Sequence, residues 1–340
     1  MPPQNGPRSR ISQSCAASVQ SHPVALPCCP NPALRRMPFI LASALAFSCL
    51  FVVSPGIALA SAWTQPQGDT LVIAKVLHSD GTAWFDDSHR RGDFGNNGRS
   101  RQDQFNVYVE HGFTDQLSAI GNFYFTEVGF NKDEQINGAP GRARRSTSGF
   151  ADQEIGLRYA LPSASDDVWH SSVQVLASIP AYGRSKTYDP DNPSRNPALG
   201  LGDYGMELRY SRGRGYTLGD HNGYVDLGGA VRLRGSAASD EVRVDASTGL
   251  SLTPSWLLLG EVNVIQGLGN GHKDAFISGQ TPADAGFVAT GTNYDLTKLQ
   301  LSTLYTAPGG SQWQVGYQQP VMGRNTGAAG GPFAAAWWRF

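Results

Sequence analysis

The chain ends on Phe333-Ala334-Ala335-Ala336-Trp337-Trp338-Arg339-Phe340, in which Ala334, Ala336, Trp338 and Phe340 occupy every second position. Successive side chains of an extended strand point to opposite faces, so these four residues share one face. The stretch therefore predicts a C-terminal β-strand with one apolar, partly aromatic face.

The same period of two recurs upstream, and helical spacing is almost absent after Trp63. Clear examples are Phe105–Glu110, Val225–Leu233 and Glu241–Leu252. Twelve candidate strands begin near residues 70, 102, 117, 150, 168, 201, 222, 241, 256, 293, 312 and 332. Most are about 10 to 13 residues long, which is enough to cross a bilayer when tilted.

Short and long connections alternate between these strands. Short turns are expected at residues 113–116, 162–167, 212–221, 253–255 and 307–311. Longer loops are expected at 80–101, 131–148, 180–200, 267–292 and 323–331, with a shorter member of this set at 235–240. Periplasmic turns and longer external loops are typical of outer-membrane barrels. The predicted fold class is therefore all-β, a transmembrane antiparallel β-barrel of about 12 strands.

The N-terminal region has the pattern of an export signal. Arg35-Arg36 precede an apolar run from Pro38 to Leu59 that ends in small residues, so cleavage fits after Ala60 or after Ala62. We expect an unstructured leader at 1–36, which also allows a true start at Met37, a signal peptide at 37–62 and the barrel at 63–340. The cysteines all precede the cut, which leaves no thiol in the mature chain: Cys15, Cys28, Cys29 and Cys49.

Charge argues against nucleic-acid binding. The whole chain has a net charge of −1. Its first 62 residues hold four arginines and no acid, which leaves 23 basic and 28 acidic residues, a net charge of −5, in the exported part. A protein that binds phosphate backbones needs a basic excess instead.

An internal similarity supports the strand register. The segments Gly149–Tyr159 and Gly200–Tyr210 share the frame G-x-x-D-x-x-x-x-L-R-Y. We expect both to be strands that run towards the periplasm from a long loop.

The polar parity of the strands predicts sixteen charged side chains inside the barrel, eight acidic and eight basic. They are Lys75, Glu110, Asp152, Glu154, Arg158, Asp203, Glu207, Arg209, Asp226, Arg232, Arg234, Arg243, Asp245, Glu261, Lys298 and Arg339. All except Lys75, Arg234 and Arg339 are our candidate lumen-lining residues. The balance is compatible with a structural ion-pair network or with a weakly selective polar pore.

Catalysis is a weaker alternative. A lipid hydrolase needs a nucleophile and a base on neighbouring strands, and the candidates are His78-Ser79, His170-Ser171-Ser172 and His111. No supporting acid or amide forms a recognisable motif with them. We expect no enzyme activity, no cofactor and no metal site.

Several segments resemble a family of outer-membrane proteins, the "MetA pathway of phenol degradation" family. They are Ala62–Gly68, Glu110–Leu117, the two G-x-x-D frames, Asn196–Gly200 and Gly323–Gly327. The resemblance implies a barrel in the outer membrane that takes up a small organic solute, with aromatic or hydrophobic compounds among the candidates. A non-transporting structural or adhesive barrel remains an alternative.

The expected partners follow from this location. They are outer-membrane lipid, lipopolysaccharide, the small-molecule solute and the barrel-assembly machinery, which we expect to recognise the terminal Phe340; nucleic acid is not expected.

Overall fold

The computed structural model describes residues 62–162, 168–187, 196–235, 238–271 and 290–340. The predicted leader and most of the signal peptide lie outside this part of the chain. Within it, no helix is both long and apolar enough to span a membrane.

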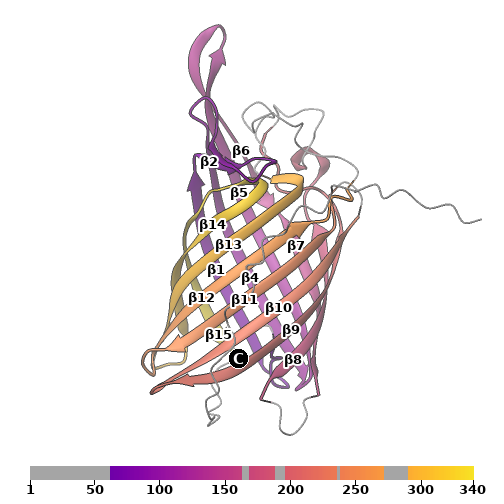
Figure 1. Cartoon of the computed structure of the whole chain (residues 1–340), viewed down its shortest axis with the longest axis vertical. Helices are drawn as coiled ribbons and strands as arrows, with labels where there is room; N and C mark the ends of the chain where they lie inside the picture. The colour runs from indigo at the N-terminus through magenta and orange to yellow at the C-terminus, as the bar shows by residue number, and fades with distance from the viewer. Residues whose placement is uncertain (1–61, 163–167, 188–195, 236–237, 272–289) are drawn as a thin grey trace, which may run out of the picture. The chain divides into compact units, whose positions relative to one another are not determined.

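The described ranges form twelve membrane-crossing strands (Figure 1). They are β1 (Thr70–Gly81), β4 (Arg99–Thr114), β5 (Leu117–Ile136), β7 (Asp152–Leu161), β8 (His170–Pro180), β9 (Gly205–Leu218), β10 (His221–Arg234), β11 (Glu241–Ser251), β12 (Trp256–Gly267), β13 (Thr290–Thr306), β14 (Gln312–Gly327) and β15 (Gly331–Arg339). Three further strands and a short helix lie on the extracellular side, namely β2 (Ala83–Phe85), β3 (Arg91–Asp93), β6 (Ala139–Phe150) and η1 (Arg184–Lys186).

The sheet closes on itself with antiparallel pairing throughout. The first and last strands pair from Leu71 opposite Arg339 to Leu77 opposite Phe333, and β13 pairs with β14. A closed sheet leaves its twelve strands without an open edge, as a bilayer requires. The predicted twelve-stranded barrel is thus confirmed.

The exterior of the barrel is apolar, and the interior face carries most of the buried polar residues. Leu208, Leu301 and Val315 are exposed by 58 to 62%, which is the pattern of strands that face lipid. Trp256 and Tyr305 contact each other near the periplasmic ends of β12 and β13, with ring centroids 4.9 Å apart. Aromatic residues at this level of a barrel suit the interface between the hydrocarbon and the headgroups.

The internal similarity reflects two equivalent strands, β7 and β9. In each, the Leu and the Tyr of the shared frame are exposed on the outer face, at 51% for Leu157 and 58% for Leu208. The arginine between them points inward and is largely buried in both strands, at Arg158 and at Arg209.

Three predicted connections are wrong because strands extend beyond the bilayer. Residues 131–148 form no loop but a hairpin of β5 and β6, which rises above the barrel rim (Figure 1). Residues 212–218 continue β9, so that only Gly219 and Asp220 make the turn. Residues 323–327 continue β14. The expected loop at 267–292 falls mainly outside the described residues.

The loop after β1 packs on the extracellular rim. Its strand β2 pairs with the end of β14, where Thr326 lies opposite Phe85. Trp84 and Phe94 pack against Phe130, an inward-facing residue of β5. This loop therefore covers part of the inner wall at the rim.

Candidate channel interior

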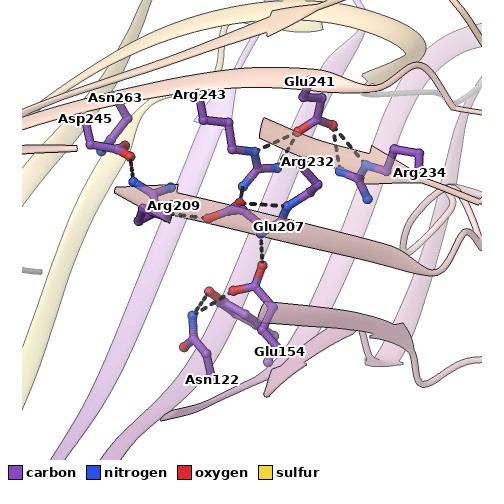
Figure 2. A network of polar contacts seen from close by, with 11 residues as sticks. Asn122, Glu154, Glu207, Arg209, Arg232, Arg234, Glu241, Arg243, Asp245 and Asn263 are labelled. Atoms are coloured by element: carbon purple, nitrogen blue, oxygen red, sulfur yellow. Dashed lines mark hydrogen bonds and ion pairs between the residues drawn. The ribbon is translucent and has the colours of Figure 1, made fainter. Parts of the chain in front are cut away.

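Glu207 on β9 is the centre of an ion-pair network on the interior face (Figure 2). It accepts hydrogen bonds from Arg209 Nε and Arg232 Nε, each at 2.9 Å, and Arg243 Nη1 lies 3.5 Å from it. Arg232 also donates to Glu154 at 2.5 Å. The Glu207 side chain is almost fully buried, and such partners offset its lost hydration.

Glu241 extends this network towards the extracellular rim. One of its oxygens accepts from Arg234 at 2.6 Å, and the other accepts from Arg243 at 2.5 Å. Arg243 therefore joins Glu207 to Glu241, and the network ties β9, β10 and β11 together. Sequence reasoning missed Glu241, although it has the same parity as Arg243 and Asp245 and the alternation alone would have placed it inside.

Arg209 continues the network towards the middle of the barrel. It is ion-paired with Asp245, which also accepts from Asn263 Nδ2 at 2.8 Å. Lys298 lies directly opposite Asn263 in the β12–β13 register. Acidic and basic groups thus alternate around this part of the interior wall.

A second cluster lies nearer the periplasmic end, around Arg158. Its guanidinium donates to Glu110 at 3.1 Å and to Gln174 Oε1 at 2.9 Å. Tyr108 donates from its hydroxyl to the same Glu110 carboxylate at 2.8 Å. Both side chains of the Arg158–Glu110 ion pair are buried. The pair therefore contributes to packing as well as to charge compensation.

A third cluster joins β1 to β12 and β13, which lie beyond β15 and β14 in the sheet. Lys75 donates to Gln300 at 3.3 Å, and Gln300 donates to Glu261 at 2.6 Å. The ammonium of Lys75 also lies 4.1 Å from the centre of the Phe333 ring. Near these residues the wall becomes apolar, with a buried cluster that contains Leu259.

Residues 62–67, here called the N-terminal strap, lie against the interior face at the periplasmic end. The Ala62 N–H donates to Asp226 at 2.8 Å, Arg158 donates to the Trp63 carbonyl at 3.1 Å, and the Gln65 N–H donates to Ser118 at 3.0 Å. These contacts reach strands far apart in the sequence. The strap therefore occupies interior space that the strand pattern alone would leave open.

Trp63 anchors the strap. Its ring lies 5.5 Å from the His170 ring and 6.4 Å from the Tyr224 ring. A methyl group placed on Gly213 would lie only 2.5 Å from the Trp63 ring. The glycine at 213 is thus required for the close approach of the indole.

A cavity of about 250 Å³ is lined by Arg158 and Asp226, which bind the strap, and by Arg209 and Asp245 of the charged network. Its wall combines apolar and aromatic residues such as Leu259, Tyr224 and Trp337 with the charged groups Asp226 and Glu261. The volume is slightly below the roughly 300–1,000 Å³ of pockets for drug-sized ligands.

The structure distributes the predicted residues unevenly. The main network contains Glu154, Glu207, Arg209, Arg232, Arg243 and Asp245. Glu110 and Arg158 form the second cluster, and Glu261 belongs to the third. Lys298 lies opposite Asn263 in the β12–β13 register, and Asp226 binds the N-terminal strap.

Two predicted residues lie apart from these groups. Asp152 accepts a hydrogen bond from the Tyr182 hydroxyl at 2.8 Å, and Asp203 accepts one from the Ala238 N–H at 2.7 Å. Both contacts fix extracellular connections. Asp152 and Asp203 thus hold extracellular connections in place. The alternation along the strands could not predict this role.

The three candidate histidines have other partners in the described part of the chain. His78 contacts Asp103 at 2.6 Å and His111 contacts Thr70 at 2.8 Å, while His170 lies against Trp63. Among the described residues, no group of three or more His, Cys, Asp and Glu is arranged to hold a metal ion.

These features define a class: a closed antiparallel barrel with a lipid-facing apolar exterior and a polar interior is an outer-membrane β-barrel. The structure of the COG4313 outer membrane channel from Pseudomonas putida F1 is similar, with a TM-score of 0.57 and 14% identity over 84% of this chain and 100% of that one. The NanC porin structure is more distant, with a TM-score of 0.42 and 8% identity over 78% and 98% of the two chains.

At these identities the likeness concerns the fold. No family model matches the sequence, and no curated protein matches it. The chain thus has the fold of an outer-membrane β-barrel, and its resemblance to the phenol-degradation family stays a prediction.

Proposed function

We propose that this protein is a passive outer-membrane channel for a small organic solute, aromatic or hydrophobic compounds included, and that it is not an enzyme. The observation that carries the proposal is the interior cavity, whose lining combines Leu259, Tyr224 and Trp337 with charged groups such as Asp226 and Glu261. An apolar ring can lie against Leu259 and Trp337 while its polar substituents contact the charged groups. The resemblance found in the sequence points to the same class of solute.

The interior charges support weak ion selectivity. Acidic and basic side chains alternate from Glu154 to Asp245, so the interior does not present a wall of one sign. Selective ion pores instead use rings of like charge. We therefore propose a pathway that discriminates by size and polarity more than by charge.

The test is a pair of transport measurements on the purified protein. We expect discrete single-channel conductance in planar bilayers with little preference between cations and anions, together with swelling of liposomes in small aromatic solutes. The absence of both signals would contradict the proposal.

A non-transporting structural or adhesive barrel is the second candidate, and the projecting β5–β6 hairpin is the observation that favours it. Its Arg142 pairs with Asp133 at 2.8 Å well above the bilayer. The structural candidate replaces the channel if two results are found together. The protein gives no conductance and no liposome swelling, and cells that express it without residues 131–148 lose surface attachment.

We also propose that the barrel-assembly machinery recognises the C-terminal strand, because the Phe340 side chain is 75% exposed. Removal of Phe340 should lower the folded fraction in the outer membrane, measured by the heat-dependent gel shift of folded barrels.

A further inference from the structure

Two lysines of the barrel interior differ from its arginines in having no carboxylate partner. Each of these arginines forms an ion pair with an acidic side chain: Arg158, Arg209, Arg232, Arg234 and Arg243. Within the described ranges, neither Lys75 nor Lys298 forms an ion pair. A charge in a confined interior is costly without a counter-charge, and an anion that enters the barrel can supply it.

The Lys298 side chain lies on the interior face of β13. The nearby Leu299 and Leu301 are exposed on the lipid side by 44 and 62%, whereas Gln300 contacts the interior residue Glu261. Alternation along the strand therefore turns Lys298 inward, like Gln300. Its ammonium group forms no hydrogen bond in the part of the chain that the structure describes.

The strand next to Lys298 is irregular. The β13–β14 register shifts at this point, because Met322 lies opposite Thr297 but Pro320 lies opposite Lys298. Val321 is thus an extra residue of β14, and Pro320 has no N–H to donate. A bulge of this kind redirects nearby side chains and is frequent beside functional sites.

Lys75 on β1 is oriented by uncharged groups. Its ammonium lies 4.1 Å from the centre of the Phe333 ring and 3.3 Å from Gln300 Oε1. These contacts hold the ammonium in place and leave its charge uncompensated.

The two lysines share one acidic neighbour, Glu261, with which both of their charges interact. Asp245, another acid near Lys298, is already ion-paired with Arg209. The described side chains around Glu261 therefore carry an excess of positive charge, although the interior as a whole is balanced.

Both lysines border the interior cavity. Glu261 and Asn263 line it. Lys298 lies directly opposite Asn263 in the β12–β13 register, and Lys75 is linked to Glu261 through Gln300. A ligand whose apolar body lies in the cavity can thus direct an anionic substituent towards the lysines.

We propose that Lys298 and Lys75 form a binding site for the carboxylate of a small organic acid with an apolar or aromatic body. An ammonium group has three hydrogen-bond donors on a flexible stem and accommodates a carboxylate as a compact charge. The inference rests on the proposed channel function and narrows its class of solute.

The experiment compares benzoate with benzyl alcohol, which have the same ring but differ in the carboxylate. Isothermal titration calorimetry of the full mature protein in detergent should show that benzoate binds at least about tenfold more tightly, as one charge-assisted hydrogen bond would give. The double variant Lys75→Gln, Lys298→Gln should lose this preference and bind benzyl alcohol as the wild type does. Lys298→Arg alone keeps the charge and should retain the preference.

The matched control is Lys132→Gln with Lys186→Gln, which removes two lysines on the extracellular side and should bind benzoate as the wild type does. The heat-dependent gel shift checks that every variant folds. Equal affinity of the wild type for the two compounds would overturn the proposal, and so would an equal loss of benzoate affinity in the double variant and the control.

Failure of the channel function is a separate result. If liposomes swell in neither compound while calorimetry still shows the preference for benzoate, transport is contradicted and the carboxylate site is supported.

Discussion

At the scale of single residues, Glu207 has the most demanding environment, because one buried carboxylate serves three arginines. Its replacement by Gln removes a negative charge that three buried guanidinium groups share, although each of them keeps a second carboxylate partner. We expect Glu207→Gln to lower the free energy of unfolding by about 1.5–3 kcal/mol, measured by urea titration of the folded barrel in detergent.

The partly exposed pair of Arg145 and Glu134 on the hairpin provides the comparison, with Nη2 and Oε1 3.2 Å apart. Glu134→Gln should change the unfolding free energy by no more than about 1 kcal/mol. If the two substitutions had equal effects, the network around Glu207 would have no special role in stability.

Gly213 offers a second prediction at this scale. A Cβ atom there would overlap the Trp63 ring, so Gly213→Ala should weaken the seating of the N-terminal strap by about 1–3 kcal/mol. We expect a higher single-channel conductance and faster proteolysis of the strap.

Gly229 on β10 is the matched control, because no atom lies within 4 Å of a Cβ placed there. Gly229→Ala should conduct as the wild type does. If the two alanine variants conducted alike, the strap would not limit the pathway.

At the scale of elements, the strap bears on the choice of cleavage site. Ala62 is only 1% exposed and its N–H is bound by Asp226, so a mature chain that begins at Trp63 would lose this contact. We predict cleavage after Ala60, and the intact mass of protein purified from outer membranes measures it. A mature mass that begins at Trp63 would contradict this.

The β5–β6 hairpin should respond to pH through Asp133. Hydrogen bonds from Asn97 at 2.7 Å and Arg142 at 2.8 Å hold the pKa of this carboxyl below its usual range. Because the pKa is lower in the folded state, the stabilisation is present above the unfolded value of about 3.9 and is lost as the pH falls through the folded value.

We therefore expect hydrogen exchange in the hairpin to show protection that is constant near neutral pH and decreases below about pH 4. The effect should be small, since the group is exposed. Asp133→Asn should have the lower protection near neutral pH, and the two proteins should converge as the Asp133 carboxyl of the wild type is protonated. A wild type and a variant with the same pH profile would rule out this role for Asp133.

The same hairpin shows how a local signal can be overlooked. Its turn is Asn137-Gly138, with φ of 51° and 80°, and Asn-Gly is the preferred pair for a two-residue hairpin turn. The segment looks like a loop when only the length of a bilayer strand is considered. The turn residues would have predicted the extended strands correctly.

At the scale of the whole molecule, the charge balance of the interior should set ion selectivity. Asp245→Asn with Glu261→Gln removes two negative charges from the walls of the cavity and leaves a basic excess. We expect the reversal potential in a salt gradient to shift towards anion preference.

The control for this measurement is Asp133→Asn with Glu134→Gln, which removes two negative charges from the exposed hairpin instead. Its reversal potential should remain close to that of the wild type. An equal shift in both variants would indicate an effect of overall charge rather than of the interior wall.

The alternation of residues along each strand determined the barrel, the number of its strands and which charges face inward, because the period of two is a local property of an extended chain. Only the tertiary structure decided that Glu207 meets three arginines, that Asp152 and Asp203 hold loops, and that the strap enters the barrel. These contacts depend on the register between neighbouring strands and on the approach of residues far apart in the sequence. Ala62 and Asp226, for example, are 164 residues apart. Alternation along a strand predicts the face on which a side chain lies, whereas the closed sheet determines which residues that side chain contacts.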